Sequence, residues 1–431
     1  MFIQKLRKLS AGDILKLVLC AFTAAFLIGA VLAPDRGDML GGFWRILTRP
    51  SLLTKDYFFA EIGSVSGAFL NAALVGTVCC ALMFIPGATV GSGTVAAYML
   101  TIGFCYFGIN VLNILPFILG TYVYSLIKKQ PFAKFINFAM FSTALAPLVS
   151  EVLWRYPNTE VHGITFLGVV LALVIGVVVG VVMPALCAHS QNFHKGFDLY
   201  NAGPAAGFLC FMIFVIMYKA LGIEAPAVAA TLGEGHALFC NAFALICFVL
   251  CLIFGLLING SFKGYGKLVM DNGHKADFVG KYGIGPAMIN FGVYGLFILA
   301  YYNLIGAKFT GPTFGVVWCM LAFCCGGSTP VNVLPIMIGY VLASLVGVNA
   351  INAQAIVVGL CFASGLAPVT GKYGPIAGII AGIMHYCMVT SVPAIHGGFN
   401  LYNGGFTSGI IAFVLVPVLE HFFKTREEKK A

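Results

Sequence analysis

A polar, glycine-rich phrase occurs twice in a chain that is otherwise very apolar. It reads HKGFDLYNAGPAAG over residues 194–207 (motif 1) and HGGFNLYNGGFTSG over residues 396–409 (motif 2). Residues of these types suit neither a surface loop nor an apolar core, so we expect two membrane-dipping segments that line a solute path. Eight positions agree at an offset of 202, from 194 to 396, namely His194/His396, Gly196/Gly398, Phe197/Phe399, Leu199/Leu401, Tyr200/Tyr402, Asn201/Asn403, Gly203/Gly405 and Gly207/Gly409.

The residue types in the motifs suggest what these segments do. Glycine permits irregular backbone and close approach, so six glycines are expected to form the backbone of re-entrant segments: Gly196, Gly203, Gly207, Gly398, Gly405 and Gly409. Tyrosine and asparagine offer hydrogen bonds, which predicts solute-binding roles for Tyr200, Asn201, Tyr402 and Asn403. The alternative is structural, with glycines that pack helices and Tyr and Asn side chains that satisfy one another across an interface.

One position breaks the likeness of the motifs, because Asp198 in motif 1 corresponds to Asn400 in motif 2. An ionisable side chain is costly inside a membrane, so Asp198 is predicted to couple a proton or sodium ion, or to bind solute together with Asn400. His194 and His396 are predicted to take part in coupling, because imidazole exchanges protons near neutral pH. In the alternative, Asp198 lies at the cytoplasmic rim and pairs with Lys195, and both histidines are interfacial.

A second repeat lies upstream of the motifs. Residues 63–126 align without a gap on residues 282–345 at an offset of 219, and Asn113-Ile-Leu-Pro116 corresponds to Asn332-Val-Leu-Pro335. A proline inside an apolar helix is expected to free a backbone carbonyl near each asparagine. We therefore expect Asn113 and Asn332 to contribute to solute binding. The alternative is that each proline only bends its helix.

The composition requires a membrane around these motifs. Of the 431 residues, 60% are hydrophobic and 9% are charged, which excludes a soluble globular fold. A helix needs about 20 apolar residues to cross a bilayer, and we predict an all-α polytopic membrane protein with about 14 spans. Those near Ser92 and Gly311 are expected to be half-spans. The spans begin near Leu15, Val65, Ser92, Asn110, Lys134, Gly163, Ala206, His236, Pro286, Gly311, Pro330, Asn352, Pro375 and Phe406.

Two inverted copies of one architecture account for this pattern. We expect an N-terminal span and loop (1–62), repeat 1 (63–221), a connector helix with a basic loop (222–281), repeat 2 (282–423) and a basic tail (424–431). The opening spans of the two repeats lie an odd number of crossings apart, so the copies enter the membrane from opposite sides. Inverted repeats are typical of transporters that handle solute near the midplane, at the repeat interface.

The charges suggest an orientation. If the N-terminus is cytoplasmic, the main basic clusters fall on the cytoplasmic side, as the positive-inside rule expects, and the loop at residues 34–56 is the exception. We expect both termini in the cytoplasm and the chain in a bacterial inner membrane, and the net charge of +9 does not indicate a nucleic-acid partner. The clusters are Lys128/Lys129/Lys134, Lys263/Lys267/Lys275/Lys281, Lys372 and Lys424/Arg426/Lys429/Lys430, in addition to Lys5, Arg7 and Lys8.

Sequence signatures of enzyme, metal or cofactor chemistry are missing. The sequence contains no phosphate-binding GxxxxGK[ST] loop, no HExxH, no GxSxG elbow and no CxxCH haem site. Its 14 cysteines form no CxxC pair and lie mostly in apolar runs, which is typical of buried, reduced thiols. We therefore expect no enzyme activity, no cofactor and no metal site.

The paired phrases LAPL…GFDLYNAG and LAPV…GFNLYNGG resemble a family of bacterial multi-pass membrane proteins known only as a domain of unknown function. That resemblance covers nearly the whole chain and implies a membrane location without an activity. A weaker resemblance, to urea transporters, is limited to Gly196, Tyr200, Asn201 and their copies, because the inverted halves of those proteins carry a GxxGYNG-like phrase. Asp198 and the higher span count depart from that neutral pore.

The sequence thus predicts a transporter or channel for a small polar solute, with the two motifs meeting at the repeat interface. Proton or sodium coupling is expected at Asp198. The alternatives are a passive, urea-channel-like pore and a membrane-embedded subunit or intramembrane enzyme that works with a partner. The expected partners are the solute, a coupling ion, the lipid bilayer and a second copy of the chain in a homo-oligomer.

Overall fold

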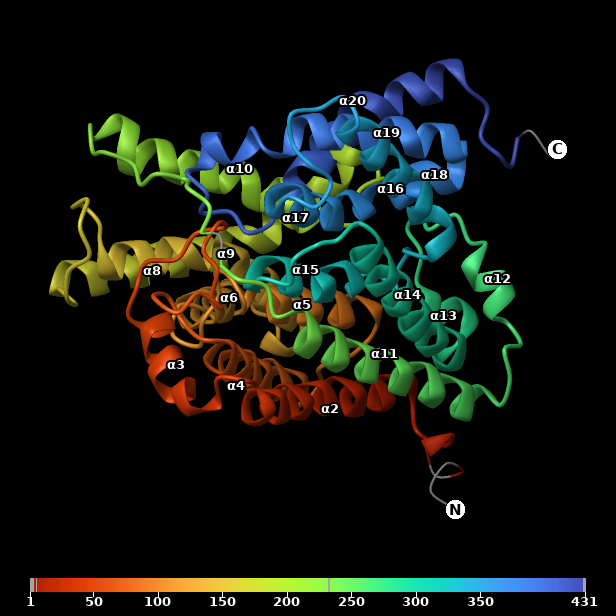
Figure 1. The fold of residues 1–431 in the computed structure, drawn as a ribbon, viewed down its shortest axis with the longest axis horizontal. Coiled ribbons are helices and arrows are strands. Elements are labelled where there is room, and N and C mark those ends of the chain that lie inside the picture. The colour runs from red at the N-terminus through yellow and green to blue at the C-terminus, as the bar shows by residue number, and fades with distance from the viewer. Residues whose placement is uncertain (1–3, 5, 232, 429–431) are drawn as a thin grey trace.

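The computed structural model describes residues 4, 6–231 and 233–428, and the regular structure within these ranges is helical throughout, which confirms the predicted all-α class (Figure 1). Each predicted span coincides with a helical segment. Nine segments in the described ranges are long and apolar enough to cross a membrane: α2 (Ala11–Leu32), α4 (Val65–Met83), the unit from η2 to α8 (Phe132–Trp154), α9 (Phe166–His194), α10 with the π-helical turn η4 (Ala202–Ala220), α11 (Ala237–Asn259), α14 (Ile284–Leu304), the unit from α17 to α18 (Gln354–Tyr373) and α20 (Asn403–Phe422).

The remaining predicted spans are shorter apolar helices, and they include both expected half-spans. They are α5 (Ser92–Phe104), α6 (Leu115–Ile127), α15 (Gly311–Leu321), α16 (Pro330–Ser344) and α19 (Pro375–Val389). Two of the long segments are built from shorter pieces: α7 (Ile136–Ser142), η3 (Thr143–Leu145) and α8 (Ala146–Trp154) in the first, and α17 (Gln354–Ala363), η5 (Ser364–Leu366) and α18 (Ala367–Tyr373) in the second. The connecting elements include α3 (Met39–Leu47), α12 (Tyr265–Val269), α13 (Phe278–Tyr282) and η6 (Val392–His396).

Local sequence explains two breaks that matter for the site. The LAP phrases form the tight turns η3 and η5, and each is followed by a helix with Pro147 or Pro368 in its first turn. Proline is tolerated there because the first N–H groups of a helix have no intrahelical acceptor, whereas inside a helix its ring would displace a carbonyl. Two spans are therefore interrupted at equivalent places, and backbone carbonyls are free to accept bonds from other segments.

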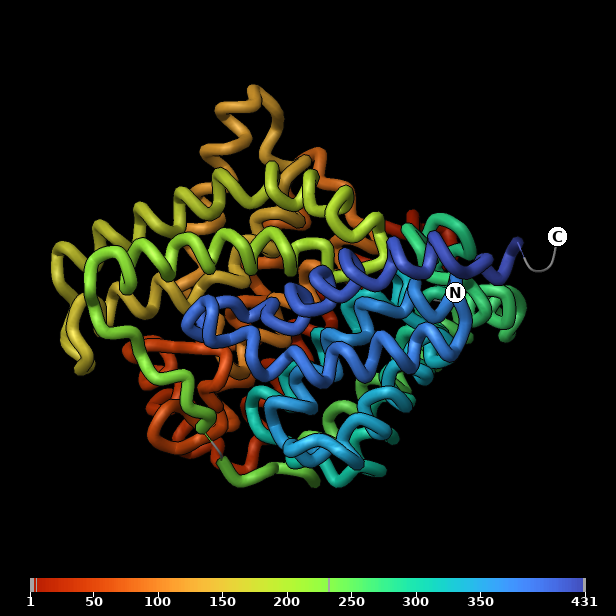
Figure 2. Tube along the Cα trace, turned by 90° about the horizontal axis from the view of Figure 1, so that it is seen from above, coloured from red at the N-terminus to blue at the C-terminus, as the bar shows by residue number. Residues whose placement is uncertain are grey.

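The two halves of the chain repeat one arrangement of helices. α2 packs along α4 as α11 packs along α14, and α6 packs along α9 as α16 packs along α19. The expected connector α11 thus holds the place in the second half that α2 holds in the first. Between the halves, equivalent helices touch, because α5 contacts α15 and α10 contacts α20. Figure 2 shows α10 and α20 side by side where the two halves meet.

Equivalent residues meet at two points, which places them on the axis that relates the repeats. The thiol of Cys319 contacts the carbonyl oxygen of Leu100 at 3.8 Å, and these residues correspond at the offset of 219. The backbones of Gly203 and Gly405, equivalent at 202, meet so closely that a Cβ on Gly203 would lie 2.4 Å from the Gly405 carbonyl carbon. Glycine is needed there because two helices cross backbone to backbone.

α2 and α11 run side by side in opposite directions along one edge of the molecule (Figure 1). Arg7 donates to the Leu257 carbonyl at 2.8 Å near one end, and the rings of Phe26 and Phe243 are 5.7 Å apart toward the other. The start of α2, the end of α20, α12 and α13 all lie at the right-hand end of this view. Lys5, Lys429 and Lys430, which belong to the predicted basic clusters, lie outside the described residues.

The expected pair of proline-containing helices is found in one repeat only. Pro335 lies inside α16, as predicted. Pro116 lies in the first turn of α6, so the predicted interior proline is wrong for the first repeat. The difference has a local cause: residues 110–114 form turns in which Asn110 accepts from the amides of Leu112 and Asn113, so the helix begins later than the apolar run suggests.

Candidate functional site

Each motif forms a non-helical bend between two helices. Residues 195–201 of motif 1 join α9 to α10, and residues 397–402 of motif 2 join η6 to α20. Two consecutive residues in each bend have left-handed backbone, with φ of 51° and 82° at Lys195 and Gly196, and of 62° and 76° at Gly397 and Gly398. Glycine at the second position of each pair avoids the steric cost of such backbone. The predicted interruption of helical backbone is therefore present in both motifs.

The histidine and asparagine of each motif hold this bend in shape. In motif 1, His194 Nε2 lies 3.0 Å from Asn201 Oδ1, and Asn201 Nδ2 donates to the Cys187 carbonyl at 2.8 Å. Motif 2 repeats the arrangement with His396, Asn403 and Val389, at 2.9 and 3.0 Å (Nε2 to Oδ1, then Nδ2 to the carbonyl oxygen). These contacts supply a structural role for the predicted coupling histidines and the two predicted solute-binding asparagines.

Each motif docks on the opposite repeat through its leucine. The Leu199 amide donates to the Gly365 carbonyl in η5 at 3.0 Å, and the Leu401 amide donates to the Ala144 carbonyl in η3 at 3.1 Å. Because η5 belongs to repeat 2 and η3 to repeat 1, the two halves exchange their motifs. The interrupted spans described above thus provide the acceptors for both bends.

The leucine side chains fill spaces that exist only because the opposite repeat carries glycine. A Cβ on Gly108 would lie 2.4 Å from Leu401 Cδ2, and a Cβ on Gly327 would lie 2.8 Å from Leu199 Cδ2. Gly108 and Gly327 are equivalent at the offset of 219 and follow the short helices α5 and α15. The docking is therefore reciprocal at the level of side chains as well as backbone.

The predicted site residues Asn113 and Asn332 support these docking points. Asn113 Nδ2 donates to the Gly108 carbonyl at 3.0 Å, and Asn332 Nδ2 donates to the Gly327 carbonyl at 2.8 Å. Their Oδ1 atoms accept from backbone amides at 2.8 Å, so each side chain bridges the turn that follows a short helix. Neither asparagine contacts a motif directly. Each holds in place the glycine against which a motif leucine packs.

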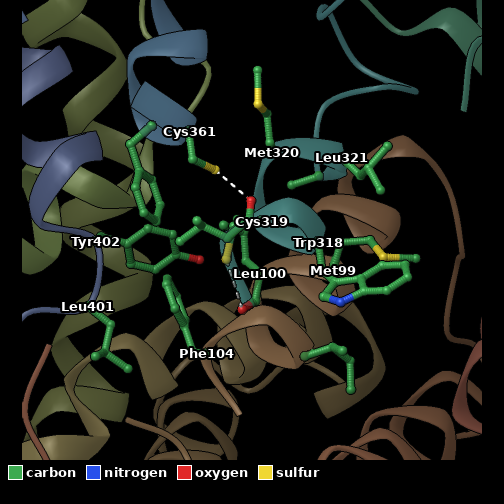
Figure 3. Close-up of a cluster of buried hydrophobic side chains, with 14 of the residues drawn as sticks. Met99, Leu100, Phe104, Trp318, Cys319, Met320, Leu321, Cys361, Leu401 and Tyr402 are labelled. Carbon is green, nitrogen blue, oxygen red and sulfur yellow. Dashed lines mark hydrogen bonds between the residues drawn. The ribbon is translucent and has the colours of Figure 1, made fainter. Parts of the chain in front are cut away.

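The motif tyrosines reach the ends of α5 and α15. Tyr402 packs edge-on against Phe104 at 5.0 Å between ring centroids, and Tyr200 packs edge-on against Phe323 at 4.8 Å, where Phe104 and Phe323 are equivalent residues. Figure 3 shows Phe104 and Tyr402 beside the Leu100–Cys319 contact on the repeat axis. Both tyrosines therefore lie at the centre of the repeat interface.

Asp198 is buried within this interface. Its carboxylate is 2% exposed, and Oδ1 accepts from the Tyr200 amide at 2.9 Å. Oδ2 finds no hydrogen-bond partner among the residues that the structure describes. Lys195 instead pairs with Glu420 at 2.5 Å, so the alternative of a rim pair between Asp198 and Lys195 is wrong.

Asn400 has the same surroundings as Asp198 with the opposite hydrogen-bonding character. Its Oδ1 accepts from the Tyr402 amide at 3.0 Å, and Nδ2 has no partner within the described part of the chain. Asp198 thus presents an acceptor oxygen without a partner, and Asn400 presents a donor group without a partner, among the described residues. A buried polar atom without a partner carries a free-energy cost, which a bound ligand or proton can offset.

More hydroxyl groups gather on the Asp198 side. The Tyr200 hydroxyl lies 3.2 Å from Ser364 Oγ and from two backbone carbonyls, and the Tyr294 and Ser328 hydroxyls are buried without a hydrogen-bond partner among the described residues. The equivalents of Tyr294, Ser328 and Ser364 in repeat 1 are Val75, Ile109 and Thr143, so two of these three hydroxyls are missing there. Polarity therefore weakens the symmetry that the backbone keeps. Within the described residues, no three His, Cys, Asp or Glu side chains gather as metal ligands would.

Two acids in the linkers before α4 and α14 were missed by sequence reasoning: Asp56, which is buried, and Asp277, which is exposed. Asp56 Oδ1 accepts from the Gly311 amide at 2.8 Å, at the start of α15, and Asp277 Oδ1 accepts from Ser92 Oγ at 2.6 Å, at the start of α5. Asp56 and Asp277 are equivalent at an offset of 221, and each bonds to the first residue of the short helix in the other repeat, Asp56 as a cap on a backbone amide and Asp277 through a side chain. An acid followed by an aromatic residue at both positions was the available signal.

The same linkers cover the two bends. The Leu53 amide donates to the Gly398 carbonyl at 2.9 Å, and His274 Nε2 donates to the Lys195 carbonyl at 3.0 Å. The His274 ring also packs at a tilt against Phe197, with 4.5 Å between ring centroids. Leu53 and His274 correspond at the offset of 221 that relates Asp56 to Asp277. The linker residue over motif 2 is thus apolar, whereas the one over motif 1 has a titratable ring.

Comparison with known proteins agrees with the duplicated architecture. The family described as "Protein of unknown function (DUF1576)" matches residues 36–219 and again residues 236–421. The first match begins after α2, whereas the second includes α11, the counterpart of α2 in the second half. No curated protein and no solved structure matches the chain. The chain belongs to the DUF1576 family of proteins of unknown function, as the paired phrases predict.

Proposed function

We propose that this membrane protein transports a small polar solute through the interface between its two repeats. The observation that carries the proposal is the pairing of a nearly symmetric, reciprocally docked backbone with buried polar groups that differ between the two sides, an acid with several hydroxyls at motif 1 and an amide at motif 2. Alternating access in transporters with inverted repeats uses such a backbone, since similar halves adopt two exchanged conformations with little difference in energy. A site placed at the interface is then opened to each side in turn.

Asp198 is the coupling group in this proposal. A carboxylate without a cation partner costs free energy in an apolar interior, and binding a proton or sodium ion removes that cost. The free carboxylate of Asp198 and its proton- or sodium-bound form therefore favour different arrangements of η5 and of the α10–α20 crossing, which surround it. Tyr200, Ser364, Tyr294 and Ser328 supply hydroxyl groups for the solute beside this carboxyl.

The orientation follows from the basic loops. α12 and α13, the start of α2 and the end of α20 share one end of the molecule, and this end carries most of the clustered lysines. The positive-inside rule assigns such an end to the cytoplasm. We therefore propose a bacterial inner-membrane protein with both termini in the cytoplasm, motif 1 toward the cytoplasm and motif 2 toward the outside.

The test is uptake by the purified chain in sealed liposomes, scanned over labelled small polar solutes with and without proton or sodium gradients. We expect one solute class to accumulate against its gradient when an ion gradient is imposed. Asp198→Asn makes motif 1 match motif 2 and should abolish accumulation while leaving downhill exchange. Lys195→Gln, which removes a neighbouring charge that pairs with Glu420, serves as the matched control and should retain coupling.

Three outcomes separate this function from its competitors. Flux that is fast, downhill and independent of every ion gradient indicates a passive pore. Unchanged accumulation and pH dependence in Asp198→Asn removes Asp198 from the coupling step. Absence of flux for every solute class, together with a co-purifying protein, contradicts transport by this chain and indicates a subunit of a larger assembly.

A further inference from the structure

An apolar groove lies between α2 and α11, on a face of the molecule remote from the motifs. Its volume is about 480 Å³, and every lining side chain is apolar. Leu17 and Leu250 are about half exposed along its edges, and Phe22 is buried at its base. The full lining consists of Leu6, Leu17, Val18, Ala21, Phe22, Ala25, Cys247, Leu250, Cys251, Ile253, Phe254 and Leu257.

The groove extends over one half of the membrane thickness. On α11 its lining runs from Cys247 to Leu257, which is roughly 15 Å at 1.5 Å per residue, or about half of a 30 Å hydrocarbon core. Beyond it the seam between the two helices is filled by rings, since Phe243 lies 5.7 Å from Phe26 and 4.9 Å from Phe69 between centroids. On α2 the lining continues to Ala25, just past the middle of that helix, so the opening runs from the N-terminal end of α2 to about its centre.

The end of the groove at the membrane surface is basic. Arg7 donates to the Leu257 carbonyl at the last lining position of α11, and Lys8 and Lys263 are exposed close by in the sequence. The nearest acids in the two segments, Asp13 and Asp271, pair with Lys16 and Lys281 at 3.8 and 2.6 Å. Basic groups at the end of membrane helices attract anionic lipid headgroups. A second copy of this chain would bring an identical positive rim to the same place and be repelled, so charge favours a lipid over self-association.

We propose that this groove holds one acyl chain of an anionic phospholipid from the leaflet at the N-terminal end of α2, with its phosphate near Arg7, Lys8 and Lys263. The apolar lining fits a hydrocarbon chain, the length fits one leaflet, and the rim fits a negative headgroup. The bound lipid fills the seam between α2 and α11, the equivalent first helices of the two halves. It thereby acts as a structural ligand of the repeat interface, independently of any solute.

The first experiment compares two phenylalanine substitutions on α2. Ala21 lines the groove, whereas Ala24 is exposed on the same helix and does not. Native mass spectrometry of the full chain in phosphatidylglycerol and phosphatidylcholine mixtures should show one retained phosphatidylglycerol in the wild type and in Ala24→Phe. In Ala21→Phe the amount of retained phosphatidylglycerol should fall at least tenfold. In Lys8→Gln/Lys263→Gln, occupancy should persist while the preference for phosphatidylglycerol falls by about fivefold per lysine removed.

A second measurement requires no change in the groove. Trp318 packs edge-on against Phe22 at 5.9 Å, and Phe22 lines the groove base. In a Trp44→Phe/Trp154→Phe background, phosphatidylglycerol with brominated acyl chains should quench Trp318 more strongly than brominated phosphatidylcholine. Equal quenching by both lipids, or equal phosphatidylglycerol retention by Ala21→Phe and Ala24→Phe, would overturn the proposal. So would a dimer that Ala21→Phe converts to monomer at unchanged lipid content, since a second copy would then occupy the groove.

Discussion

The carboxylate of Asp198 occupies space that only glycine at position 365 leaves open. A Cβ on Gly365 would lie 2.6 Å from Asp198 Oδ1 and 2.5 Å from the Tyr200 ring. The equivalent residue in the first repeat is Ala144, which faces motif 2. Motif 1 therefore combines an acid with a glycine of the opposite repeat, and motif 2 combines an amide with an alanine of the opposite repeat.

We predict that Gly365→Ala damages the site while Ala144→Gly is tolerated. Adding the methyl group at 365 forces Asp198 and Tyr200 from their positions, and overpacking of this kind costs about 1–3 kcal/mol. Ala144→Gly adds no atoms and should cost about 0.5–1 kcal/mol, the usual difference between the two residues. Thermal unfolding in detergent measures stability, and liposome uptake measures function. Equal melting temperature and uptake for Gly365→Ala and wild type would show that the space is not needed.

The two histidine–asparagine pairs should behave as structural fasteners. Asn201→Ala or Asn403→Ala leaves a buried ring nitrogen and a carbonyl without their partners, which costs about 1–3 kcal/mol for each substitution. We expect lower yield and melting temperature for both variants, with the apparent KM for solute changed less than the stability. The measurement is thermal unfolding and concentration-dependent uptake on the same preparations. A selective rise in KM at normal stability would restore the solute-binding role predicted from the sequence.

A double-substitution cycle tests the docking of motif 2 on repeat 1. Gly108→Ala should be destabilising by about 1–3 kcal/mol through its clash with Leu401, and Leu401→Ala by about 2–5 kcal/mol through the cavity it leaves. The double variant should be more stable than the sum of the two losses, because the new methyl group enters the space that the leucine vacates. Strict additivity of the two unfolding free energies would mean that the two side chains do not touch.

The cap of α15 should make stability depend on pH. Burial raises the pKa of Asp56 to about 6, against hydrogen bonds from the Phe58 and Gly311 amides that lower it. Since the folded pKa exceeds the unfolded value, the folded protein takes up a proton between about pH 4 and 6. The free energy of unfolding should therefore fall as pH rises through this window, by up to about 3 kcal/mol.

Asp56→Asn should remove this part of the pH dependence while keeping an acceptor for the Gly311 amide. Asp56→Ala, which loses both the cap and the titrating group, should also lose this pH dependence and should be less stable than Asp56→Asn at every pH by about 0.5–2 kcal/mol. Thermal unfolding in detergent between pH 4.5 and 7.5 distinguishes the two variants. If Asp56→Asn keeps the wild-type slope, another group is responsible for the pH dependence.

Sequence periodicity was sufficient to predict the helices but not their contacts. Apolar runs locate every long segment because a membrane helix must bury its backbone over about 20 residues. The offset between repeats identifies equivalent residues, such as Asp198 and Asn400, and so located the break in symmetry. It says nothing about which residues touch, so the exchange of Leu199 and Leu401 between repeats was not predictable. The same holds for Asp56 and Asp277, whose partners lie more than 180 residues away in the chain.

Proline and asparagine were the residues most easily misread. In an apolar run Pro116 suggests a kink, yet a proline is equally acceptable as the start of a helix, and only the turns made by Asn110 decide between the two. Asn113 was predicted to bind solute because Pro116 was expected to free a backbone carbonyl beside it. Its side chain instead bonds to nearby backbone and to Ser150, and a single sequence does not reveal whether such partners belong to the protein or to a ligand.

The exchange of motifs and caps between the halves sets the order of biogenesis. Synthesis proceeds from the N-terminus, so the first 221 residues enter the membrane before Gly365, which receives Leu199, and before α15, which Asp56 caps. During that interval the Asp56 carboxylate and the Leu199 amide lack the partners that they have in the complete fold. A truncated or stalled chain would expose the same groups. The interactions of the first half are thus completed only when the second half has been made.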